Sequence, residues 1–270
     1  MKIGYWYAFV DEGIHPVELG RALEERGYDA LFLGEHTNLP VGDDQPMPNE
    51  EQTRTHPRLT EPLTTLAVVA GATERLTLGT SVLLAAQHEP IVTAKAIASL
   101  DTFSGGRVVL GVGAGWHDGE LRAHGVDPAK KVAVLREHML AMRAIWSADE
   151  AEFHGEHVDF GPLYSWPKPV SGPTVLVGGG RKPAARKIAE YADGWLPIYP
   201  GDPDALVSDV AALRAQADRE VPVTVMNAPP DKDVLAKLAT AGIDRALLEL
   251  PRADRDATLR TLDGHAGLLT

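Results

Sequence analysis

Two glycine-rich segments and one acid–imidazole pair are the parts of this sequence that could do chemistry. The first segment is Gly111-Val112-Gly113-Ala114-Gly115-Trp116, and it follows a short apolar run. Glycines just past a strand let the backbone approach a flat or phosphorylated ligand, because no Cβ stands in the way. A tight turn that only reverses the chain is the alternative. The segment does not complete a Rossmann fingerprint, because Trp116 stands where the third glycine would be.

The second segment, Gly178-Gly179-Gly180-Arg181-Lys182-Pro183, lies between a predicted strand and a predicted helix. It offers free backbone N–H groups, the positive end of a helix dipole and two cations, which together suit a phosphate group. A flexible turn with a solvated basic pair is the alternative. Consecutive glycines cost chain entropy that a plain turn does not require, and this favours the phosphate.

Glu35 and His36 follow the second predicted strand and form the acid–imidazole pair. An imidazole titrates near neutral pH, so His36 could hydrogen-bond a substrate or act as a general acid. Its alternative role is to anchor the long loop that begins at Glu35. Glu35 could orient His36, or it could form an ion pair with Arg54 or Arg58.

Composition argues against several other chemistries. The chain has 270 residues, a net charge of −12 and no cysteine. The negative charge argues against nucleic acid or an anionic membrane as partner, and the lack of cysteine excludes disulfides and thiolate nucleophiles. Neither a convergent His/Asp/Glu ligand set nor a Gly-x-Ser-x-Gly elbow follows the strands, so no metal site and no serine hydrolase is predicted. Without a signal peptide or a membrane-spanning run, the chain is expected to be cytoplasmic.

A regular alternation of elements must position these residues. Short apolar strands alternate with amphipathic helices about eight times. This order predicts a parallel sheet covered by helices, and eight repeats close such a sheet into a (β/α)8 barrel, here a single domain over residues 1–270. An open doubly wound sheet is the alternative, but it would place a glycine fingerprint where Tyr5-Trp6-Tyr7 stands. The predicted strands are 3–7, 30–34, 76–82, 108–112, 175–177, 195–198, 221–225 and 246–250.

Two long segments interrupt this alternation. Residues 35–59, after the second strand, are polar and show no periodicity, and residues 147–173, before the fifth strand, contain the pattern of a short hairpin over 151–160. Loops of this length in compact domains are usually functional or disordered, so both are expected to shape a pocket. Since the active site of a (β/α)8 barrel lies at the carboxyl ends of its strands, the residues that follow each strand should gather at one mouth.

Several of these motifs together resemble the bacterial luciferase-like monooxygenase superfamily, and more narrowly its deazaflavin-dependent oxidoreductases, which use coenzyme F420. The resemblance covers the first through about the sixth strand. It implies a bacterial luciferase-like TIM barrel, usually homodimeric, with the flat ring of the cofactor across its mouth. The motifs are Gly34-Glu35-His36, Gly79-Thr80-Ser81-Val82, Ala94-Lys95, Leu100-Asp101 before Ser104-Gly105-Gly106-Arg107, Gly111 to Trp116, and Val177-Gly178-Gly179-Gly180 with Ala192-Asp193-Gly194-Trp195.

The resemblance also implies roles for individual residues. His36 matches the active-site histidine of the family, and Glu35 precedes it where some relatives have aspartate, so both are catalytic candidates. Trp116 stands where the sugar-phosphate dehydrogenases of the family have a glutamate acid, so that substrate class is not expected. The implied cofactor-binding positions are Ser81 and Val82 at a non-proline cis peptide behind the ring, Gly113, Ala114, Gly115 and Trp116 along the ring, and Gly178, Gly179 and Gly180 at the phosphate.

The sequence therefore favours a coenzyme F420-dependent oxidoreductase that transfers a hydride between the deazaflavin and a small organic substrate. Two alternatives stay open: an FMN-dependent monooxygenase on the same fold, and a cofactor-binding protein without turnover. Tyr5, Trp6 and Tyr7 are the predicted substrate pocket. Trp6 and Trp116 are expected to stack on a ring or to form pocket walls, with core packing as the alternative. The expected partners are a small-molecule substrate and a second copy of the chain.

Overall fold

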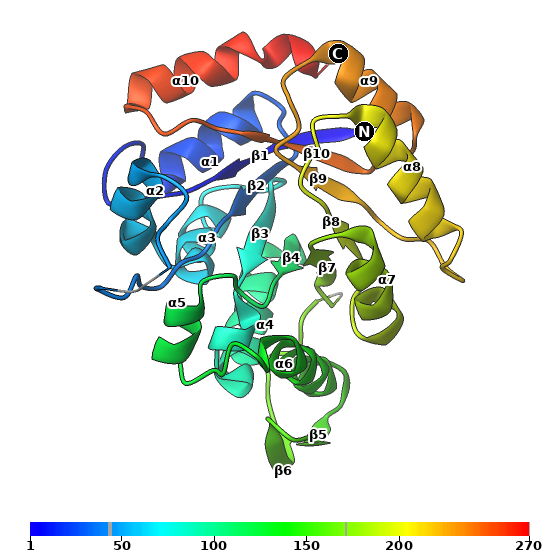
Figure 1. The fold of residues 1–270 in the computed structure, drawn as a ribbon. Coiled ribbons are helices and arrows are strands. Elements are labelled where there is room, and N and C mark those ends of the chain that lie inside the picture. The colour runs from blue at the N-terminus through cyan, green and yellow to red at the C-terminus, as the bar shows by residue number, and fades with distance from the viewer. Residues whose placement is uncertain (43–44, 171, 270) are drawn as a thin grey trace.

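The computed structural model describes residues 1–42, 45–170 and 172–269, and its main feature is a closed parallel sheet. In this part of the chain an eight-stranded sheet runs in the order β8-β7-β4-β3-β2-β1-β10-β9 (Figure 1). Bridges from Trp195 to Val223 and from Ile198 to Met226 join its two ends. The predicted (β/α)8 barrel is thus confirmed. The strands are β1 (Lys2–Tyr7), β2 (Ala30–Leu33), β3 (Thr77–Leu83), β4 (Val108–Val112), β7 (Thr174–Gly178), β8 (Gly194–Leu196), β9 (Thr224–Met226) and β10 (Arg245–Glu249).

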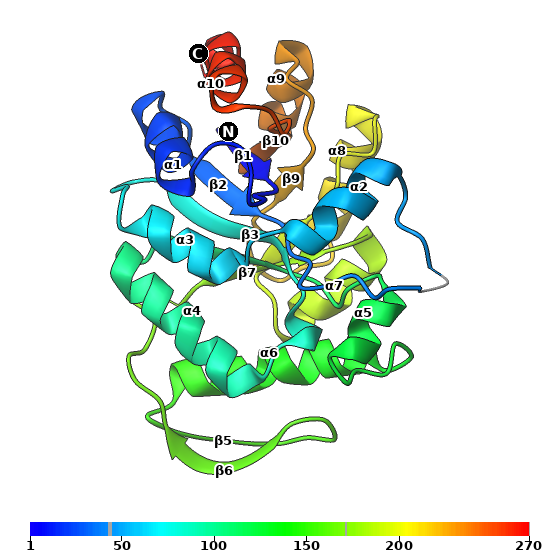
Figure 2. The same ribbon diagram turned by 90° about the vertical axis from the view of Figure 1, so that its left-hand side faces the viewer.

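Helices cover the outside of this barrel (Figure 1 and Figure 2). Proline occupies the first turn of several of them, where its missing N–H removes no helical hydrogen bond. Acidic side chains such as Glu61, Glu89 and Asp254 accept the free N–H groups of the first turn. None of the described helices combines the length and apolar character needed to cross a membrane. The covering helices are α1 (Pro16–Glu25), α3 (Pro62–Ala70), α4 (Pro90–Ser104), α6 (Lys131–Ser147), α7 (Arg181–Glu190), α8 (Pro203–Arg214), α9 (Lys232–Thr240) and α10 (Arg255–Gly264).

The alternation of side chains along each strand divides the core into two parts. Residues that point outward, such as Leu31 and Leu33 of β2, join the larger cluster with the helices. Residues that point inward fill the barrel, as Phe32 of the same strand does. Trp6 and Val82 pack against this inner cluster, so they belong to the inside of the barrel wall.

Both interruptions of the repeat contain short elements. The segment after β2 holds α2 (Glu50–Thr55) and the 3-10 turn η1 (His56–Arg58), which the sequence did not predict, because 6 residues are too few for a helical period to show. The segment before β7 holds β5 (Glu150–His154) and β6 (Asp159–Tyr164), an antiparallel pair that confirms the predicted hairpin. A further short helix that was not predicted, α5 (Asp118–Ala123), follows β4 and lies at the mouth.

The barrel wall leaves no room for a side chain at Gly111 on β4. A Cβ at this position would lie 2.2 Å from the carbonyl oxygen of Thr80 and 2.5 Å from Cδ2 of Leu196. We expect Gly111→Ala to lower the free energy of unfolding by about 3 kcal/mol, because backbone would have to move. Urea unfolding measures this loss. Gly161→Ala on β6, where a Cβ meets nothing, is the control and should change stability by less than about 1 kcal/mol. Equal losses would contradict the prediction.

Candidate active site

The carboxyl ends of β2, β3, β4 and β7 meet at one mouth of the barrel, because neighbouring strands in this series pair in parallel. The residues after each strand therefore share one rim (Figure 1). His36 follows β2, Trp116 follows β4 and Gly179 follows β7. The structure thus brings the predicted segments to the same end of the barrel.

A buried ion pair between His36 and Glu120 forms the centre of this mouth. Nδ1 of His36 lies 2.7 Å from Oε2 of Glu120, and the backbone N–H of Thr37 donates to Oε1 at 2.8 Å. The side chain of His36 is 9% exposed and that of Glu120 is 0% exposed. Burial acts to raise the pKa of Glu120, but the hydrogen bond and charge of His36 and the amide of Thr37 hold it below its usual value. Glu120 is therefore a fixed carboxylate that orients the imidazole.

Other rings surround His36. The ring centroid of His56 lies 4.5 Å from that of His36, and the ring centroid of Trp116 lies 6.0 Å away. Trp116 is 40% exposed, so it forms the outer side of this enclosure. Within the described ranges, Nε2 of His36 has no hydrogen-bond partner, since the hydrogen bond of this ring is made by Nδ1. Nε2 is the atom of this ring that a bound molecule can reach.

Glu35 does not form the contacts expected from the sequence. One of its oxygens accepts the backbone N–H of Leu84 at 2.6 Å, and the other lies 2.7 Å from Nε2 of His88. The expected pairing with Arg54 or Arg58, or with the ring of His36, is therefore wrong. Burial acts to lower the pKa of His88, but the hydrogen bond and charge of Glu35 raise it above the ordinary value. Glu35 braces the loop after β3 against the loop after β2.

The predicted cofactor-binding segments contact one another through Val82. The peptide bond between Ser81 and Val82 is cis, as the resemblance implied. A Cβ on Gly113 would lie 2.7 Å from Cγ2 of Val82, and one on Gly178 would lie 3.4 Å from Cγ1. Gly113 therefore lets Val82 close the back of the mouth, whereas the distance at Gly178 is an ordinary van der Waals contact. Of the neighbouring residues, Ala114 packs on the main core and Gly115 has a φ of +83°, which suits glycine.

The start of α7 is open to solvent on the side where a phosphate was predicted. Cβ atoms built on Gly179 or Gly180 would meet no atom within 4 Å. Both glycines line a cavity of about 360 Å³ with Arg181 and Trp195. Gly180 is the N-cap of α7 and supplies no side-chain cap, so N–H groups of the first turn are free to bind an anion. Arg181 already pairs with Asp209 at 2.9 Å.

The structure separates the predicted substrate pocket of Tyr5, Trp6 and Tyr7. Neighbouring residues of a strand point to opposite faces, so three consecutive side chains cannot share one pocket. Trp6 points into the barrel. The ring of Tyr5 is fully buried outside it, and its hydroxyl lies 2.8 Å from Nδ1 of His265. Tyr7 also points outward but lies at the end of β1, where it lines a pocket beside the mouth.

Several buried polar atoms at the strand ends have no hydrogen-bond partner within the described residues. They include Nε1 of Trp6 on β1, Oγ of Ser81 on β3 and Oδ1 of Asn227 just after β9. Buried polar groups are almost always paired, so such atoms suggest a missing ligand. A planar ring with polar edges would satisfy them. No cluster of three or more His, Asp or Glu in the described ranges could hold a metal ion.

Glu120, His56 and His88 are the site residues that sequence reasoning missed. Glu120 stands only four positions after Trp116, the last residue of the first glycine-rich segment, and this closeness was the signal available in the sequence. It lies on the short helix α5, and its burial is visible only in the structure. His56 and His88 follow polar or irregular segments and carry no local pattern.

The chain is similar to known proteins over most of its length. The family model for luciferase-like monooxygenase matches residues 14–241. An uncharacterised protein of Mycobacterium tuberculosis is 36% identical over 261 residues, which span 92% of this chain and 90% of that protein. An FMNH(2)-dependent dimethylsulfone monooxygenase of Pseudomonas putida is 30% identical over 161 residues, which span 58% of this chain and 44% of that protein.

Solved structures share the fold. Monooxygenase RslO1 from Streptomyces bottropensis superposes with a TM-score of 0.80 at 18% identity and covers 100% of this chain and 98% of its own. An F420-dependent secondary alcohol dehydrogenase, in complex with an F420-acetone adduct, superposes with a TM-score of 0.76 at 16% identity. The match covers 100% of this chain and 99% of that chain. At these identities the likeness shows the fold alone. The match to the family model shows the family as well: the chain belongs to the luciferase-like monooxygenase family.

Proposed function

We propose that this protein is a coenzyme F420-dependent oxidoreductase that transfers a hydride between the deazaflavin and a small organic substrate. The observation that carries the proposal is the imidazole of His36, whose Nδ1 is tied to Glu120 while Nε2 is free at the mouth. Hydride transfer to or from a carbonyl or an activated double bond must be balanced by a proton, and this imidazole is placed to handle one. The fold shared with an F420-dependent secondary alcohol dehydrogenase supports the proposal.

The residues around the mouth fit such a cofactor. The unpartnered atoms of Trp6 and Ser81 would hydrogen-bond the edges of a planar ring, and Val82 would lie behind it. The open backbone at Gly179 and Gly180 would hold the phosphate of its tail. When bound, the deazaflavin supplies or accepts the hydride, which no side chain can do.

His36 holds the proton in this proposal, and Glu120 positions it. A carboxylate on Nδ1 fixes which ring nitrogen faces the substrate and stabilises the protonated ring. His56 is no second proton donor, because burial and the neighbouring charge of His36 lower the pKa of His56 to about 4. Its neutral ring instead packs beside His36 and excludes water from one side.

An FMN-dependent monooxygenase is the second candidate. It is favoured by the 30% identity to the FMNH(2)-dependent monooxygenase over 58% of this chain. Both cofactors carry a planar tricyclic ring and a phosphate, so the same residues would hold either. They differ in reaction with oxygen, which a reduced deazaflavin undergoes slowly.

Titration with each cofactor decides between these candidates. We expect purified protein to bind coenzyme F420 with a micromolar dissociation constant and to bind FMN at least about tenfold more weakly. Quenching of cofactor fluorescence measures both. Tighter binding of FMN, together with oxygen consumption by the reduced complex, would instead establish the monooxygenase. Binding of either cofactor without turnover of any alcohol or carbonyl compound would leave a binding protein.

Substitutions at His36 and Glu120 test the proton step. We expect His36→Ala to lower kcat by about 10²–10⁴, the usual contribution of a general acid. Glu120→Gln keeps an acceptor for Nδ1 but removes the charge, so kcat should fall about tenfold. The pH above which activity declines should also move down, because a neutral amide stabilises a protonated ring less well.

These changes in kcat and in the pH profile are measured by steady-state kinetics from pH 5 to pH 9. Cofactor affinity is measured for each variant as well. Glu152→Gln on the exposed hairpin is the matched control and should behave like the unaltered protein. An unchanged pH profile in Glu120→Gln would contradict the positioning role of Glu120. An unchanged kcat in His36→Ala would remove His36 from the mechanism.

His56 should make the fold sensitive to acid. In the unfolded chain its pKa is near the ordinary 6.5, whereas in the folded chain it is about 4, so between these values the unfolded state binds more protons. The stability that depends on a neutral His56 is complete above pH 6.5 and is lost as the pH falls toward 4. Between pH 7 and pH 4.5, we expect the free energy of unfolding of His56→Gln to fall by about 2 kcal/mol less than that of the unaltered protein. Urea unfolding at both pH values measures the difference, and equal losses would refute it.

A further inference from the structure

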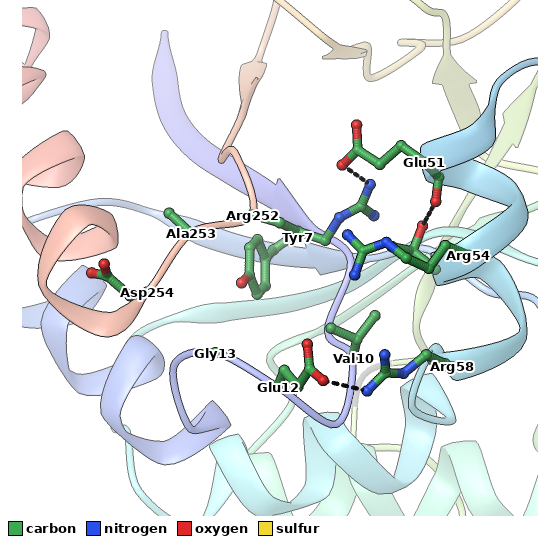
Figure 3. A pocket seen from close by; sticks show the side chains of 11 residues that line it. Tyr7, Val10, Glu12, Gly13, Glu51, Arg54, Arg58, Arg252, Ala253 and Asp254 are labelled. Carbon is green, nitrogen blue, oxygen red and sulfur yellow. Dashed lines mark hydrogen bonds and ion pairs between the residues drawn. The ribbon is translucent and has the colours of Figure 1, made fainter.

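A second pocket lies beside the mouth, between α2, the loop after β1 and the loop after β10 (Figure 3). Its volume is about 320 Å³, which is enough for a small polar group. Figure 3 shows the ring of Tyr7 within it, with the guanidinium groups of Arg54 and Arg252 extending into the space beside that ring. Arg58 and Glu12 line its lower side in this view.

The arginines form the inner surface of this pocket, and their acidic partners lie at its edge. Arg58 pairs with Asp11 at 2.6 Å and with Glu12 at 2.7 Å, and Arg252 pairs with Glu51 at 2.6 Å. The side chains of Arg58 and Arg252 are 33% and 23% exposed, whereas those of the three carboxylates are 65%, 66% and 62% exposed. A molecule that passes this acidic edge therefore meets guanidinium groups inside the pocket.

Two donors of the pocket are unused. Arg54, which lines the pocket, makes neither a hydrogen bond nor an ion pair within the described ranges, although its charge helps to lower the pKa of Glu51. The hydroxyl of Tyr7 likewise has no hydrogen-bond partner there. Asp254, the remaining carboxylate of the lining, accepts the N–H of Ala257 at 2.7 Å and caps α10. The pocket thus offers one cation without an ion pair and one neutral donor.

This pocket belongs to the same mouth as His36. Thr55 lines it, and the ring of the next residue, His56, lies beside that of His36 with centroids 4.5 Å apart and an interplanar angle of 49°. Around the closed barrel, β2, β3 and β4 separate β1 from β7 on one side, and β10, β9 and β8 separate them on the other. The pocket at β1 therefore lies across the mouth from the glycines after β7. The two anion sites would then hold different groups, with His36 on the rim between them.

We propose that this pocket binds the carboxylate of the substrate, so that the substrate is a small organic acid whose reacting carbon lies near His36. The single cation without an ion pair matches one negative charge, and the planar fork of Arg54 matches the two oxygens of a carboxylate. A phosphate dianion suits the pocket less well, because Glu12 and Glu51 stand at its edge. The inference rests on the proposed function, since it assigns the substrate class of that site.

Binding of a matched pair of small ketones tests the proposal. The probes are 4-oxopentanoate and its primary amide, which differ in charge but hardly in shape. In isothermal titration of the full-length protein, with and without added coenzyme F420, we expect the acid to bind at least about tenfold more tightly than the amide. Arg54→Gln should abolish this preference. Tyr7→Phe keeps the buried ring and should weaken the acid about fivefold. Arg21→Gln, on the exposed face of α1, is the matched control and should keep the preference.

Each other outcome overturns the proposal. Equal binding of acid and amide, no binding of either probe, or a preference that survives Arg54→Gln would show that the pocket does not select a carboxylate. Displacement of the acid by an equal concentration of inorganic phosphate would show that phosphate is the preferred group. Failure of the proposed function would look different, because the preference for the acid would persist in a protein that binds no deazaflavin.

Discussion

The buried carboxylate of Glu120 holds two loops of the mouth together, and the rest of the candidate site depends on it. A carboxylate without solvent exposure is stable only where hydrogen bonds and an opposite charge replace its water. His36 and Thr37, from the loop after β2, supply these partners to a residue that follows β4. Because any other arrangement would leave the carboxylate unpaired, the orientation of the imidazole is fixed before a ligand arrives. His36 therefore presents Nε2 to the mouth because Glu120 binds its Nδ1.

Glu35 is a second buried carboxylate whose oxygens are bound by a backbone N–H group and an imidazole. It follows β2 and is bound by Leu84 and His88, which follow β3. Buried carboxylates thus connect the loop after β2 to the loops after β3 and β4. Each carboxylate accepts a hydrogen bond from a backbone N–H group and also binds an imidazole. Val82 completes the arrangement, because its side chain fills the space that the absent Cβ of Gly113 leaves. The mouth is held by tertiary contacts, although its residues come from loops.

The fold could be predicted from the sequence because its signals are local. Apolar strands and amphipathic helices repeat, and their number implies closure. The glycines at the mouth were found for the same reason. Partner choice is not local: Glu35 and Glu120 are both acidic residues near His36, and only the packing of α5 decides which of them binds it. Tyr5 was misplaced because three aromatic residues in a row suggest one surface, whereas a strand turns alternate side chains away. The helix α2, which carries Arg54, was missed because it is too short to show a helical period of apolar residues.

The distribution of charge bears on the two places at the mouth that offer donors to an anion. A chain with a net charge of −12 repels anions at long range, so an anionic ligand needs local donors that are shielded from the surrounding carboxylates. After β7 these donors are backbone N–H groups at the start of α7, which carry no counter-ion. Beside β1 they are arginines whose acidic partners lie outward, so the positive side faces the pocket. Since β1 and β7 stand on opposite sides of the barrel, a cofactor and a substrate held at these two places would approach one another across the mouth. Their reacting atoms would then meet beside His36, whose Nδ1 is held by the carboxylate of Glu120.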